Sequence, residues 1–241
     1  MLDGDNGIRR GLGHGKALVL NRRDFILTTT ALGSAGIWTT AAQAQASSST
    51  AASGKPLILV LGDSLSAEYG LKRGEGWVPL LEKRLAQQKI SATVVNASIS
   101  GDTSSGGRAR FAPLLAQHKP SLVVLELGAN DALRGLPLSD TESNLLQITK
   151  AAQAAGAKVL IVGIQVPPNY GADYTRRFEA VFSKVATATK SALVPFLLKG
   201  VADAPDALSL FQADRIHPTA AAQPQLLDNV WTELRKMLPK Q

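Results

Sequence analysis

The chain has 241 residues and a formal net charge of +7, enough length for one ordinary domain with an N-terminal extension. It contains no cysteine, which excludes disulfides, thiolate zinc sites, a cysteine nucleophile and a lipid-modified cysteine. His14, His118 and His217 are far apart in the chain, so we expect no metal site and no cofactor. The lysines and arginines are scattered and lack interleaved stacking aromatics, so we expect no nucleic-acid partner.

Residues 1–46 have the order of a secretory signal. Arg22 and Arg23 precede the apolar residues 25–27, a modest apolar run follows, and residues 42–46 form a small-x-small cleavage pattern. The paired arginines are similar to a twin-arginine signal. The alternative is a general secretory signal, in which the arginines only supply the positive charge before the apolar run.

The apolar run is short and interrupted by polar residues, so we expect no stable membrane anchor after cleavage. The mature protein is therefore predicted to be periplasmic or secreted. Residues 47–55 are small and polar, and are predicted to form a flexible linker before a single domain at 56–241.

The mature domain alternates apolar runs with amphipathic segments. Runs such as Leu57–Leu61 are typical of strands that are buried on both faces of a sheet. The pattern predicts strands at 57–61, 92–97, 122–127, 158–164 and 193–196, and helices at 78–87, 103–117, 142–155, 174–190 and 220–238. Pro195 indicates an edge position for the last strand. The alternation predicts an α/β fold with a parallel sheet, whose ligand site lies beyond the carboxyl ends of the strands.

Four polar motifs stand at the ends of these elements. They are Gly62-Asp63-Ser64-Leu65, Gly101-Asp102-Thr103, Gly128-Ala129-Asn130-Asp131 and Asp214-Arg215-Ile216-His217-Pro218. Each motif alone is common in turns and helix starts. Three of them follow strands of one parallel sheet, however, and so should lie on the same rim.

These motifs supply the parts of a serine hydrolase site. Ser64 is the candidate nucleophile, His217 the base that takes its proton, and Asp214 the acid that orients the imidazole. The backbone N–H groups of Ser64 and Gly101 and the side-chain amide of Asn130 are the candidate donors of an oxyanion hole.

Other residues of the rim are given supporting roles. Asp63, Asp102 and Asp131 are expected to serve their own turns through capping and local hydrogen bonds. In the loop after the fourth strand, Tyr170 and Val166 are expected to offer apolar surface to the substrate. The alternative is that this proline-containing loop is only a rigid connection.

From Leu57 to its end, the chain resembles the SGNH (GDSL) hydrolase superfamily. The four residue types that define the superfamily match Ser64, Gly101, Asn130 and His217, and its acid matches Asp214. Longer strings are similar to the periplasmic group of multifunctional thioesterase I/protease I/lysophospholipase enzymes, also called arylesterases. These strings are residues 61–70, 95–104, 125–135, 168–171 and 216–219.

The resemblance implies a flavodoxin-like three-layer α/β/α sandwich with a five-stranded parallel sheet. It also implies a metal-free serine mechanism with an acyl-enzyme, acting on acyl esters and thioesters, lysophospholipids among them. Two alternatives stay open. One is an O-acetylesterase that acts on cell-wall or exopolysaccharide glycans with the same residues. The other is a binding module for a flavin phosphate, which would leave the serine, acid and base unexplained.

Overall fold

Five parallel strands form the central sheet in the order β2-β1-β3-β4-β5. Their bounds are β1 Leu57–Gly62, β2 Thr93–Asn96, β3 Leu122–Glu126, β4 Lys158–Val162 and β5 Ala192–Val194. The computed structural model describes residues 55–239, so the expected signal and almost all of the expected linker lie outside the described residues. The predicted fold class is confirmed.

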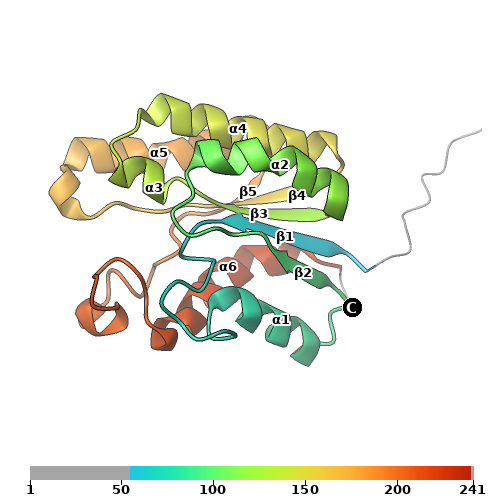
Figure 1. The fold of residues 1–241 in the computed structure, drawn as a ribbon, viewed down its shortest axis with the longest axis horizontal. Coiled ribbons are helices and arrows are strands. Elements are labelled where there is room, and N and C mark those ends of the chain that lie inside the picture. The colour runs from blue at the N-terminus through green and yellow to red at the C-terminus, as the bar shows by residue number, and fades with distance from the viewer. Residues whose placement is uncertain (1–54, 240–241) are drawn as a thin grey trace, which may run out of the picture. The chain divides into compact units, whose positions relative to one another are not determined.

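Helices cover both faces of this sheet (Figure 1). On one face lie α2 (Ser104–His118), α4 (Leu138–Ala154) and α5 (Ala172–Thr189), and on the other lie α1 (Trp77–Gln87) and α6 (Gln223–Met237). On the second of these faces, both helices bury an apolar stripe. Thus α1 buries Trp77, Val78, Leu81 and Leu85, and α6 buries Leu226, Leu227, Val230 and Leu234. Burial of such stripes against the sheet is the main stabilising contribution.

The structure differs from the predicted elements mainly in three places, and most other predicted bounds shift by one or two residues. Helix α4 begins at Leu138 rather than 142, directly after Pro137, whose fixed φ suits the residue before a helix. The short helix α3 (Ala129–Leu133) was not predicted, because five residues are too few to show a helical period. The last helix starts as a 3₁₀ turn at Ala220–Ala222 before α6 begins. Strand β5 lies at the edge of the sheet as predicted, but it ends at Val194, so Pro195 follows the strand and is not part of it.

The strand order has a topological switch point between β1 and β3. The chain leaves β1 toward β2 on one side, and β3 leads toward β4 on the other, so the connections diverge at the carboxyl ends of β1 and β3. Ligand sites of open parallel sheets occur at such a switch point. Ser64 follows β1 by two residues, and Asn130 follows β3 by four, so both lie at this switch point.

Gly62 and Glu126 face each other at the ends of β1 and β3. A Cβ atom on residue 62 would lie 2.8 Å from Glu126 Oε2 and 2.8 Å from Ser66 Oγ. The Glu126 side chain is fully buried and occupies the space in which a side chain at position 62 would stand. Gly62 is therefore required by close approach and not by its backbone conformation.

We expect Gly62→Ala to destabilise the domain by about 1–3 kcal/mol, because the added methyl overpacks a site with no free space. Chemical denaturation of the variant and the wild type would measure the change. The matched control is Ser105→Ala, at an exposed position of α2, which should stay within about 0.5 kcal/mol. Equal stabilities of the two variants would contradict the steric role of Gly62.

Candidate active site

Ser64, His217 and Asp214 form one continuous hydrogen-bonded chain. The Ser64 Oγ lies 2.8 Å from His217 Nε2, and His217 Nδ1 lies 2.7 Å from Asp214 Oδ2. Ser64 comes from the turn after β1, whereas the other two residues come from the loop before α6. The fold thus joins a hydroxyl, an imidazole and a carboxylate from segments that are 150 residues apart.

The Asp214 side chain also builds the turn that carries the histidine. Its Oδ1 accepts the backbone N–H groups of Ile216 at 2.9 Å and His217 at 3.0 Å, and Arg215, between Asp214 and Ile216, adopts a left-handed φ of 58°. These hydrogen bonds, with that from the His217 backbone contributing most, lower the pKa of Asp214 to about 2. The carboxylate is ionised at neutral pH and accepts the Nδ1–H, which leaves Nε2 as an acceptor that faces Ser64.

Two residues that sequence reasoning missed support the imidazole. The Tyr69 ring lies against the His217 ring, with centroids 4.3 Å apart and planes tilted by 36°. Gln212 donates from Nε2 to the carbonyl oxygens of Tyr69 at 2.9 Å and Pro218 at 3.1 Å, which ties the two loops together. The signal in the sequence was that Tyr69 lies five residues after Ser64, within the string 61–70 that resembles the superfamily.

Gly101 lies in a turn that two arginines hold. Its φ of +80° favours glycine, and Arg134 donates to its carbonyl oxygen at 2.7 Å. Arg110 donates from Nε and Nη2 to Asp102 Oδ2 at 2.8 and 2.7 Å, and it also donates to the carbonyl oxygens of Ala97 and Gly62. Arg110 therefore joins the turns after β1 and β2 into one unit.

The candidate oxyanion donors converge on these turns. Within residues 55–239, the backbone N–H groups of Ser64 and Gly101 donate to no protein acceptor. The Asn130 amide is engaged, because Nδ2 donates to Asp63 Oδ2 at 3.1 Å and to the Asp102 carbonyl oxygen at 2.9 Å. These two acceptors turn the amide nitrogen, rather than its oxygen, toward the turns of Ser64 and Gly101.

The three aspartates of the motifs do more than serve their own turns, which corrects the expectation of local contacts alone. Asp63 Oδ1 accepts the Leu65 N–H at 3.0 Å, as expected. Its Oδ2, however, accepts a hydrogen bond from the amide of Asn130, which is 67 residues away in the chain. Asp131 is buried and accepts from the Ser104 N–H and hydroxyl and from the Thr141 hydroxyl, which ties α3 to α2 and α4. Periodicity and turn chemistry carry no signal for such distant pairs.

A second buried carboxyl lies behind the nucleophile. Asp63 and Glu126 are both 0% exposed, and Ser66 Oγ donates to Glu126 Oε2 at 2.7 Å. Burial raises the pKa of Asp63 to about 7 and raises that of Glu126 well above its usual value. Glu126 was not among the predicted site residues, although a lone glutamate in an apolar strand was a visible signal.

The two predicted substrate-contact residues differ in exposure. Val166 is 7% exposed and belongs to the hydrophobic core, so it offers little surface. Tyr170 is half-buried in the 3₁₀ turn Pro168–Tyr170 and stacks on Tyr174, with centroids 5.9 Å apart. No ring contact or hydrogen bond links Tyr170 to Ser64 in the part of the chain that the structure describes. Its contact with substrate stays a prediction.

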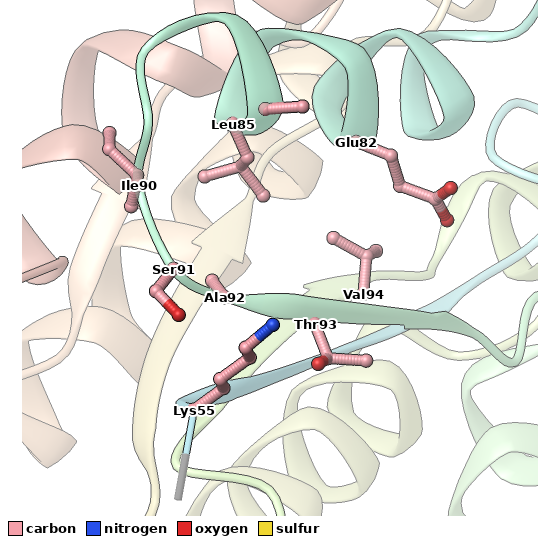
Figure 2. Close-up of a pocket in the computed structure, with 9 residues that line it drawn as sticks. Lys55, Glu82, Leu85, Ile90, Ser91, Ala92, Thr93 and Val94 are labelled. Atoms are coloured by element: carbon pink, nitrogen blue, oxygen red, sulfur yellow. The ribbon is translucent and has the colours of Figure 1, made fainter.

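A hollow of about 380 Å³ lies at the other end of the sheet (Figure 2). Lys55, Glu82 and Thr93 are among the residues that line it, and Lys55 and Thr93 mark the amino ends of β1 and β2. It is therefore separate from Ser64, and no histidine lines it. Across residues 55–239, no group of three or more acidic or histidine side chains could hold a metal ion. None of the described helices is both long and apolar enough to cross a membrane.

Comparison with known proteins places this geometry among hydrolases. The GDSL-like Lipase/Acylhydrolase family matches residues 60–223. Esterase TesA of Pseudomonas aeruginosa is 54% identical over 181 residues, which cover 75% of this chain and 89% of that protein. Thioesterase 1/protease 1/lysophospholipase L1 of Escherichia coli is 42% identical over 181 residues, which cover 75% and 84% of the two chains. The structure of the psychrotrophic esterase EstA from Pseudoalteromonas sp., inhibited by monoethylphosphonate, matches with a TM-score of 0.70 and 40% identity, over 75% of this chain and 97% of that one.

Proposed function

The chain belongs to the GDSL-like lipase/acylhydrolase family, and from that membership we propose that it is a serine esterase and thioesterase that cleaves acyl esters through an acyl-enzyme. The membership itself confirms the resemblance drawn from the sequence motifs. The observation that carries the proposal is the hydrogen-bonded chain from the Ser64 hydroxyl through His217 to Asp214.

The reaction follows from these contacts. His217 Nε2 takes the Ser64 proton as Oγ attacks the acyl carbon, and the ionised Asp214 stabilises the imidazolium that forms. His217 then protonates the leaving alcohol or thiol, and the Ser64 acyl ester remains. A water molecule repeats the attack with His217 as base, which releases the acid and restores the serine.

The oxyanion of each tetrahedral intermediate is stabilised by the N–H groups of Ser64 and Gly101 and by the Asn130 amide. The two backbone N–H groups have no protein acceptor among the described residues, which supports this role. In the structure the Asn130 amide donates to the Asp63 carboxylate and to the Asp102 carbonyl oxygen. During the reaction, one of these two N–H groups is shared between its acceptor and the oxyanion.

The substrates are acyl esters and thioesters of small molecules, lysophospholipids among them, as the names of the relatives indicate for those proteins. Residues 1–46, which lie outside the described part of the chain, are proposed to contain the signal that directs export to the periplasm or the medium. No cofactor enters this mechanism.

We expect Ser64→Ala to lower kcat/KM for a p-nitrophenyl ester by roughly four orders of magnitude or more, because no other hydroxyl is paired with a base in this chain of contacts. The thermal unfolding midpoint should stay close to that of the wild type, and Ser105→Ala serves as the active control. A fluorophosphonate probe should label the wild type at Ser64 and leave the variant unlabelled. Near-normal turnover in a folded Ser64→Ala protein would exclude the proposed mechanism.

Replacement of Asn130 by alanine should lower kcat by roughly 10²–10³-fold, the range for loss of one oxyanion donor. KM should change much less, because the donor acts on charge that develops in the transition state. Steady-state kinetics with a medium-chain ester separate the two constants. An unchanged kcat would remove Asn130 from the oxyanion hole.

A further expectation concerns Tyr170. If its ring covers an acyl chain, each buried CH₂ contributes up to ~0.8 kcal/mol, or about fourfold in kcat/KM, so the wild type should prefer medium-chain to acetyl esters. Tyr170→Ala should flatten this rise, whereas Tyr170→Phe, which keeps the ring, should preserve it. The measurement is kcat/KM across p-nitrophenyl esters of increasing chain length.

A preference for acetyl esters that Tyr170→Ala leaves unaltered would count against the acyl-chain role. It would favour instead the alternative of an O-acetylesterase that acts on glycans with the same reactive residues.

A further inference from the structure

Two carboxyl groups are buried together directly behind the proposed nucleophile. Asp63 and Glu126 are both 0% exposed, and Glu126 Oε2 accepts the Asp63 backbone N–H at 3.3 Å. Gly62 allows this approach, since any side chain there would collide with the Glu126 carboxyl group. Burial disfavours a charge on either group, and a charge on Asp63 raises the pKa of Glu126 further, so the pair retains a proton.

The hydrogen bonds decide which member carries it. Both oxygens of Asp63 accept an N–H group, Oδ1 from Leu65 at 3.0 Å and Oδ2 from Asn130 at 3.1 Å. Glu126 Oε2 accepts from Ser66 and from the Asp63 backbone, but its Oε1 is buried with no partner. An unpartnered oxygen costs far more when it bears half of a carboxylate charge than when it belongs to a neutral acid. The proton therefore resides on Glu126.

The charged groups around the pair explain why only one of its members is ionised, but they do not decide which one. Asp102, from the turn after β2, and Asp131, from α3, add negative potential at Asp63. Arg110 of α2 pairs with Asp102 and otherwise donates to the carbonyl oxygens of Ala97 and Gly62, so it does not pair with either buried carboxyl. No described basic side chain forms an ion pair with Asp63 or Glu126. A second charge on Glu126 would therefore have no compensation.

We propose that Glu126 is a positioning residue of the ester-hydrolysis site, kept as a neutral acid so that Asp63 can serve as the single buried anion that orients the Asn130 amide. Glu126 touches neither the substrate nor the reacting atoms. It acts through the turn at residues 63–66, where it accepts hydrogen bonds from the Asp63 N–H and the Ser66 hydroxyl. The inference rests on the proposed function for its kinetic consequence, but the location of the proton can be measured without activity.

The first experiment is infrared spectroscopy of the purified full chain at about pH 8 to 9, where exposed carboxyls are ionised. We expect the carbonyl stretch of one protonated carboxylic acid, shifted when the protein carries ¹³C-labelled glutamate and not when it carries ¹³C-labelled aspartate. The absence of a protonated-acid band, or a band that shifts with aspartate, would overturn the assignment. This readout needs no variant and does not depend on the identity of the substrate.

The second experiment compares variants in ester hydrolysis. Glu126→Gln, a neutral isostere, should keep kcat within about threefold and abolish the infrared band, whereas Glu126→Ala should lower kcat by roughly tenfold or more because the turn loses its acceptor. Asp63→Asn should lower kcat by roughly 10- to 100-fold with little change in KM, because a neutral acceptor orients Asn130 less firmly. Glu82→Gln, on the exposed face of α1, is the matched control.

Rescue by glutamine is the decisive comparison, since a charge requirement at position 126 would make Glu126→Gln as damaging as Glu126→Ala and would refute the neutral-acid role. If Glu126→Gln does not fold, the isotope-edited spectrum of the wild type decides alone. Failure of the ester-hydrolase proposal would show separately, as activity that survives Ser64→Ala.

Discussion

The contact of the Glu126 carboxyl group with Gly62 constrains the whole reactive edge of the sheet. β1 and β3 are the two strands whose connections diverge, and their last paired residues are Gly62 and Glu126. Because residue 62 has no side chain, the glutamate fits against the turn after β1 and accepts its Ser66 hydroxyl and Asp63 N–H. Hydrogen bonds to Glu126 of the neighbouring strand β3 thus fix the turn that carries Ser64.

A partly buried polar network extends from this contact to the turns after β2 and β3. Asp63 binds Asn130, and Asn130 binds the Asp102 carbonyl oxygen, so the turns after β1, β2 and β3 are linked by one amide group. Arg110 closes the network from α2, through the Asp102 carboxylate and the carbonyl oxygens of Ala97 and Gly62. Linked hydrogen bonds of this kind hold their members in one geometry, which oxyanion stabilisation requires.

The catalytic base His217 is positioned by a different set of contacts. Asp214 and His217 lie in the loop before α6, where short-range hydrogen bonds from the Asp214 carboxylate shape the turn. Within residues 55–239, the Ser64–His217 hydrogen bond, the Tyr69 ring and the Gln212 side chain connect this loop to the turn after β1. The site therefore combines a set of linked hydrogen bonds, which positions the nucleophile and the oxyanion donors, with a more exposed loop that supplies the base.

Local patterns in the chain were enough to define the strands, the parallel sheet and the Ser64–His217–Asp214 set. Continuous apolar runs identify buried strands, and an aspartate three residues before a histidine can orient it within one turn. Family membership then supports the kind of reaction. The short helix α3 was not predicted because it spans less than two helical turns. Val166 was expected to contact substrate but is buried, because the sequence does not distinguish core from rim at a strand end.

The tertiary structure alone decided the contacts on which the positioning of the site depends. The Gly62–Glu126 pairing, the Asp63–Asn130 hydrogen bond and the Tyr69–His217 ring contact join residues that are about 60 to 150 positions apart. Such contacts follow from strand register and loop packing, which no local pattern encodes. The sequence names the reactive groups because their chemistry is local, and the fold sets their geometry because distance and burial are properties of the packed chain.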